Sequence, residues 1–168
     1  SIKPGTNEFD CQLDNATPIL PKVRQHEKNW MPWVVGDELV FAYRANAKIN
    51  IQGEVREFTT SFAIDNISGG SQVIPFQGGY LAVVHEAKQH PSSGKRWYQH
   101  RFVWYDHDKQ LRKISLPFIF HDKVIEFAAG IAWHPDRKRL VISYGREDKE
   151  AWIATVDTCD LIGFIWHD

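Results

Sequence analysis

From Trp30 onward, apolar residues alternate with polar ones or form short runs, and glycine, proline, asparagine and aspartate separate these segments. Such alternation predicts closely spaced β-strands and almost no helix. Three segments repeat one pattern, in which a short strand, a tight turn and a second apolar strand follow one another. They are residues 33–43, 74–85 and 132–144.

The spacing of these repeats indicates the type of fold. With Leu39, Leu81 and Leu140 as register marks, successive repeats are about 42 and about 59 residues apart, near the one-blade period of a β-propeller once loop insertions are allowed. The sequence therefore predicts an all-β fold, a β-propeller segment of about three four-stranded antiparallel blades. We expect residues 1–168 to form one domain of this type.

Each predicted blade has its own strands. The first covers residues 29–62, with strands near 30–35, 38–45, 47–52 and 54–62. The second covers 71–117, with strands near 71–76, 79–87, 97–105 and 111–116. The third covers 125–166 and ends in an outer strand after Cys159 and Asp160, while residues 1–28 are expected to form an incomplete edge or a connector. Because a closed ring needs at least about four blades, we expect part of a larger propeller, a ring completed by another chain, or an open arrangement.

Composition narrows the possible partners. A net charge of −1 and a pI near 6.7, with scattered Lys and Arg, give no general attraction to nucleic acid or to an anionic membrane surface. The two cysteines, Cys11 and Cys159, have no metal-type spacing, which fits a reducing compartment, so we expect a cytoplasmic protein. Aromatic residues make up 13% of the chain, which suits propeller cores or sugar-stacking surfaces.

Five ordered segments suggest a family. They are residues 27–30, 68–71 leading into 80–85, 98–100, 125–130 and 142–148. In this order they resemble the second half of the five-bladed propeller glycosidases and phosphorylases of the β-mannoside type, glycoside hydrolase family 130, and especially the divergent branch often predicted beside glycosyltransferases. The resemblance spans residues 9–164. It implies a carbohydrate-active protein that binds a glycoside in a polar pocket at the propeller axis.

Glycosyl transfer requires carboxyl groups, and three are candidates. Glu27, Glu126 and Asp148 lie at strand starts or strand-end loops, where propellers place site residues. Glu126 is equally well explained as an outward polar residue of an alternating strand, and Glu27 as part of a solvated loop. The general-acid aspartate of the family lies on an earlier blade that nothing in this chain matches, so the catalytic acid is not visible.

Cations and hydroxyl-binding groups complete the candidate site. The resemblance implies that Lys28 and His85 correspond to phosphate-binding residues of the phosphorylases, with inorganic phosphate as a possible co-substrate. His85 also fits a structural role at the end of its apolar strand. The further substrate-binding candidates are Asn29, Tyr98 and His100. No metal site and no other cofactor are expected, because the histidines and cysteines lack ligand spacing.

Three classes of function stay open. The first is a hydrolase or phosphorylase whose acid lies outside this chain, the second a noncatalytic carbohydrate-binding module, and the third a scaffolding propeller domain of a glycosyltransferase-type protein. The expected partner is an oligosaccharide or glycoside. We expect the 168-residue chain alone to be inactive, and to associate with itself or with a missing N-terminal propeller half.

Overall fold

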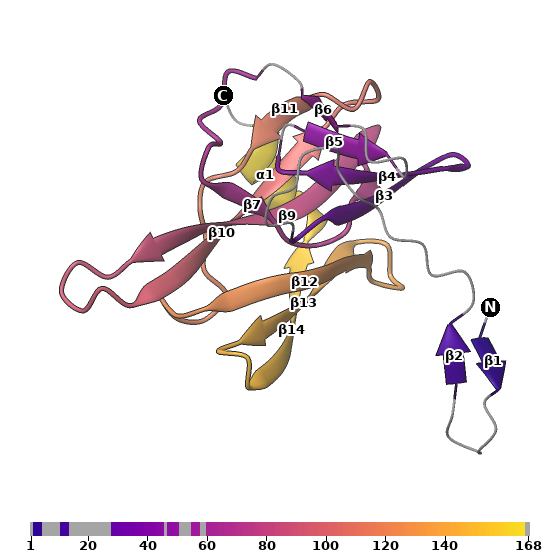
Figure 1. The fold of residues 1–168 in the computed structure, drawn as a ribbon. Coiled ribbons are helices and arrows are strands. Elements are labelled where there is room, and N and C mark those ends of the chain that lie inside the picture. Colours follow the sequence, from indigo (N-terminus) through magenta and orange to yellow (C-terminus); the bar gives the residue numbers. More distant parts are fainter. Residues whose placement is uncertain are drawn as a thin grey trace.

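The computed structural model describes residues 2–4, 11–13, 28–45, 47–50, 55–57 and 60–166, and this part of the chain is mostly β. Within it, four sheets are built from antiparallel strand pairs, and one short helix follows the last strand. The prediction of antiparallel all-β sheets is confirmed at this level. Figure 1 shows the order of the elements along the chain.

The strands form one separate hairpin and three larger sheets. The hairpin pairs β1 (Ile2–Pro4) with β2 (Cys11–Leu13). The first large sheet has the order β3 (Met31–Val35), β4 (Glu38–Tyr43), β5 (Ala47–Asn50) and β6 (Val55–Glu57). The second has the order β11 (Leu111–Ile114), β10 (Arg96–Tyr105), β9 (Gly79–Gln89) and β7 (Ile67–Gly69), with β8 (Ile74–Phe76) also on β9. The third has the order β12 (Glu126–Trp133), β13 (Arg139–Arg146) and β14 (Glu150–Asp157).

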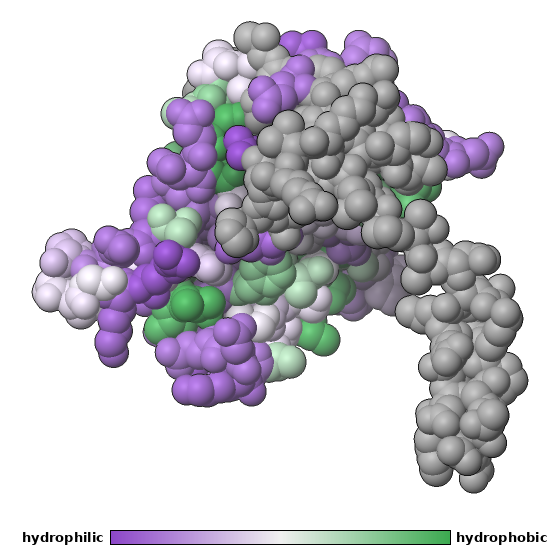
Figure 2. All heavy atoms as spheres, in the orientation of Figure 1, coloured by the Kyte–Doolittle hydropathy of each residue, from purple (hydrophilic) through white to green (hydrophobic). Residues whose placement is uncertain are grey.

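The second sheet lies between the other two and is buried on both faces. Along β9, Ala82 and Val84 pack in one hydrophobic cluster with residues of the first sheet, whereas Leu81 and Val83 pack in another with residues of the third. Successive side chains of a strand point to opposite faces, so one apolar run fills two interfaces. The long β9–β10 hairpin extends beyond the stack (Figure 1), and its tip has a mainly hydrophilic surface (Figure 2).

The leucine register does not hold across the three repeats. All three leucines lie on β4, β9 and β13, none of which is helical. Leu39 is 44% exposed, however, while Leu81 and Leu140 are fully buried and share one cluster between the second and third sheets. The two-residue turns before β4 and β9 instead align Val40 with Leu81, because each stands three residues after its turn. Both face the following sheet.

The predicted final outer strand after Cys159 and Asp160 is wrong. This segment forms the helix α1 (Thr158–Trp166). The Thr158 hydroxyl donates a hydrogen bond to the Lys138 carbonyl at 2.9 Å. Asp160 places a negative charge in the first turn, where it interacts favourably with the helix dipole. Leu161 is fully buried against the second and third sheets. Among the described residues, no helix has the length and apolar character needed to span a membrane.

Candidate functional site

Two histidines face each other inside the second sheet. His85 on β9 and His100 on β10 are direct cross-strand partners, and their ring centroids are 6.5 Å apart. Their side chains share the face that carries Leu81 and Phe102, which packs on the third sheet. Both histidines are buried, His100 completely. The apolar runs on either side therefore hold two imidazoles at an interface between sheets.

Burial keeps both imidazoles neutral near pH 7. Desolvation lowers the pKa of His85 to about 4. A hydrogen bond with the Gly69 backbone opposes this shift, and the positive charge of Lys28 adds to it. Desolvation likewise lowers the pKa of His100 to about 4, with a smaller contribution from His85. Nδ1 of His85 and both ring nitrogens of His100 are buried without a hydrogen-bond partner among the described residues. Unpaired buried polar atoms are costly, so these nitrogens are a feature that hydrophobic packing alone does not explain.

Aromatic rings surround the histidine pair. The Tyr98 ring lies 4.6 Å from that of His85 and the Phe127 ring 5.4 Å, while the Phe120 ring lies 4.6 Å from that of His100. A cavity of about 240 Å³ lies beside Phe118 and Phe120, and neither histidine lines it. The described residues thus give the histidines an aromatic surround rather than the expected polar concavity.

Glu126 is brought to this cluster but its carboxylate is already occupied. It is fully buried, and its two oxygens accept hydrogen bonds from the backbone N–H groups of Phe120, His121 and Asp122 at 2.9 to 3.3 Å. The interpretation of Glu126 as an outward polar residue is wrong, because the residue points into the sheet interface. Its present contacts hold the loop that presents Phe120 to His100.

Lys28 and Asn29 differ in their relation to the histidines. Lys28 is exposed, and its charge acts on His85, as the pKa of that imidazole indicates. The carbonyl oxygen of Asn29 lies so close to Gly69 that a Cβ there would overlap it. Gly69 pairs with Val84, whose side chain packs against the first sheet, so this contact lies on the face opposite the His85 imidazole. Glu27 lies outside the described residues.

Asp148 occupies a different environment. It is exposed in the turn between β13 and β14 and has a φ of 55°, a left-handed conformation that aspartate tolerates. The neighbouring Glu147 donates its N–H to the Ile125 carbonyl at 2.8 Å, so this turn lies beside the start of β12. A local turn requirement explains the aspartate.

Sequence reasoning missed the aromatic residues that extend this cluster. The Phe120 ring stacks on that of Tyr144 at 4.2 Å, and the Tyr144 ring on that of Trp152 at 6.5 Å. The positions of Tyr144 on β13 and Trp152 on β14 within the alternating pattern could have indicated that both side chains lie on one face of the third sheet. Phe120 lies in an irregular segment that offered none.

Comparison with known proteins does not identify this chain. No family model matches it, and no curated protein is a significant match. In the described part of the chain, no group of three or more His, Cys, Asp or Glu side chains could hold a metal ion.

Proposed function

We propose that this protein binds a β-linked oligosaccharide of the mannoside type at the end of the sheets that carries His85, His100 and Lys28. The observation that carries the proposal is the pair of buried, neutral imidazoles, of which His85 lies beside the Tyr98 ring and within the electrostatic influence of Lys28. Neutral imidazole donates and accepts hydrogen bonds, as sugar hydroxyls require, and aromatic rings match the apolar faces of pyranoses.

The finer fold proposal is that the three large sheets are blades of a propeller. Support comes from the repeated stacking, in which the second sheet packs on a neighbour with each face, and from the turn-aligned positions Val40 and Leu81, which both face the next sheet. Radial stacking of this kind brings residues from distant repeats to one end of the sheets. The proposed site combines residues of the second sheet with Lys28, which precedes β3 of the first sheet.

Binding without catalysis is the version we favour for this chain. Glycoside cleavage needs a carboxyl group free to donate a proton or activate water, and the Glu126 oxygens are engaged by three backbone donors. A hydrolase or phosphorylase remains the alternative for a longer protein that supplies the acid. Phosphate as co-substrate would rely on the positive charge of Lys28, since both histidines are neutral near pH 7.

Calorimetric titration with a β-linked mannotriose and, separately, with inorganic phosphate tests the proposal. We expect the trisaccharide to bind, and His85→Ala and His100→Ala each to weaken it by about tenfold, because hydrogen bonds to the ligand are lost. His107→Ala is the matched control, since His107 is exposed in the β10–β11 turn. Absence of trisaccharide binding, or equal affinity in all three variants, would overturn the proposal.

A further inference from the structure

An exposed tryptophan stands at the edge of the third sheet. Trp152 on β14 is 41% exposed, although it lies on the face of the sheet that carries the buried residues Ile142 and Tyr144. Its indole N–H donates to Oε2 of Glu150 at 2.8 Å, which fixes the orientation of the ring. An exposed aromatic ring held in one orientation is a preorganised stacking surface.

This ring ends an aromatic stack that begins at the histidine pair. From His100 the contacts pass to Phe120 at 4.6 Å, then to Tyr144 at 4.2 Å and then to Trp152 at 6.5 Å. The last two pairs are stacked with interplanar angles of 9° and 19°. The stack crosses from the interface between the sheets to the surface, so the two ends belong to one connected structure.

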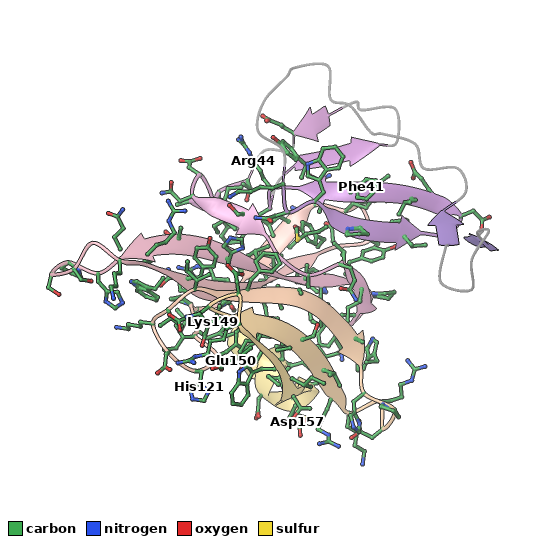
Figure 3. The ribbon with its side chains drawn as sticks, turned by 60° about the horizontal axis from the view of Figure 1, so that its bottom comes forward. Phe41, Arg44, His121, Lys149, Glu150 and Asp157 are labelled. Carbon is green, nitrogen blue, oxygen red and sulfur yellow. The ribbon has the colours of Figure 1, made fainter. Side chains whose placement is uncertain are left out.

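Polar side chains surround the exposed ring. Arg146 donates to Asp122 at 2.8 Å and to Glu150 at 3.3 Å, and the His121 ring lies 5.3 Å from that of Trp152. Figure 3 shows His121 and Glu150 at the same end of the third sheet. The hydrogen bond from Trp152 is the main cause that holds the pKa of Glu150 below its usual value. Desolvation opposes this shift, and the hydrogen bonds from Arg146 add to it. Glu150 therefore remains an acceptor near pH 7.

We propose that Trp152, with Arg146 and Glu150 beside it, forms a sugar-binding subsite that takes a further pyranose unit of the same oligosaccharide. This inference rests on the proposed function. The indole would cover the apolar face of the ring while the guanidinium and carboxylate bind its hydroxyls. Exposed ion pairs add little to the stability of a fold, so stabilisation is a weak explanation for the fixed positions of Arg146 and Glu150.

The cross-strand register places the subsite at the edge of the third sheet. Arg146 on β13 and Glu150 on β14 are direct cross-strand partners, and Tyr144 and Trp152 are the next pair on the same face. The guanidinium, the carboxylate and the indole therefore lie within one short stretch of two neighbouring strands.

Two measurements on the whole chain test the subsite. In protein labelled with ¹⁵N-tryptophan, the indole signal of Trp152, assigned through Trp152→Phe, should shift on titration with β-linked mannotriose. Trp152→Ala should weaken the trisaccharide by about fivefold, the worth of one stacking contact, while Trp152→Phe stays within about twofold of the unmodified protein. Ile153→Ala is the matched control, because Ile153 is the next residue on β14 and is 72% exposed on the opposite face.

The outcomes separate the subsite from the proposed function. If the trisaccharide binds and His85→Ala weakens it, but Trp152→Ala behaves like Ile153→Ala and the indole signal does not move, the subsite is overturned and the proposed function stands. If the indole signal shifts but His85→Ala binds the trisaccharide normally, the proposal that one oligosaccharide occupies both the Trp152 subsite and the histidine site is overturned. Absence of any binding overturns both.

Discussion

Two buried imidazoles make the stability of the folded state sensitive to pH. The pKa of each is about 4 in the folded protein, against an ordinary value of 6.5. Well above pH 6.5 both are neutral whether the chain is folded or not. As the pH falls from 6.5 towards 4, the unfolded chain takes up protons that the folded chain excludes, so the free energy of unfolding decreases.

We expect this loss to be about 2 kcal/mol for each imidazole at pH 5 relative to pH 7.5. Urea unfolding of the unmodified protein and of His100→Leu at both pH values measures it. The variant should lose less stability on acidification, because one buried titrating group is gone. His107→Leu serves as the control, since this exposed residue should leave the difference unchanged. An equal loss in all three proteins would contradict the assignment.

Neutral histidines also change what the site can bind. A neutral imidazole donates one hydrogen bond and accepts another, whereas attraction to a dianion needs positive charge. Lys28 is the cation whose charge acts on His85, and it is exposed. At residue scale, then, hydroxyl recognition by His85 and His100 is better supported than phosphate recognition.

At the scale of single elements, the contact of β7 with the start of β3 is critical. Any side chain at Gly69 would overlap the Asn29 carbonyl oxygen, which is backbone and cannot move cheaply. We expect Gly69→Ala to lower the free energy of unfolding by about 1–3 kcal/mol and to weaken oligosaccharide binding, because displacement of Asn29 also displaces Lys28, the neighbouring residue whose charge acts on His85.

Gly145→Ala provides the comparison for this prediction. Gly145 lies on β13, and an added Cβ would come no closer than 3.8 Å to the Glu150 carbonyl oxygen. Thermal unfolding and calorimetric titration of both variants give the two readouts. Equal stability of Gly69→Ala and Gly145→Ala would show that the β7 contact does not hold the segment.

The elements also show what alternation along the sequence can and cannot predict. It gives β9 and β10 within two residues of their observed bounds, because β9 carries an unbroken apolar run that is buried on both faces and β10 is rich in aromatic residues. It fails at α1, where the run around Leu161 has no strict period and the acidic first turn decides for helix. The leucine register fails because turn geometry, rather than residue identity, aligns Val40 with Leu81.

For the candidate site as well, regular strands could be predicted from the sequence and irregular segments could not. That His85 and His100 lie on neighbouring strands could be predicted, since β9 and β10 form one hairpin joined by the loop at residues 90–95. The contacts of Phe120 with His100 and Tyr144 could not, because an irregular segment from Pro117 to Ile125 carries Phe120 back over the sheets. The backbone donors that occupy Glu126 belong to this segment as well.

At the scale of the whole molecule, the stack of three sheets has two outer faces. The first sheet presents the cross-strand pair Val34 and Leu39, 62% and 44% exposed, and the third sheet presents Ile153. The second sheet shows how such faces are covered in this protein, namely by another sheet. Exposed apolar sheet faces favour association.

We therefore expect the chain to associate with a second copy through one of these faces. Sedimentation velocity at micromolar concentration should detect a dimer or a larger species. Val34→Glu or Ile153→Glu should shift the protein towards monomer, because a charge cannot be buried unpaired in such an interface. The control is Leu116→Glu, since Leu116 is 71% exposed in the loop after β11 and belongs to neither the first nor the third sheet. A monomer at all concentrations, or equal dissociation by Leu116→Glu, would show that neither sheet face is an interface.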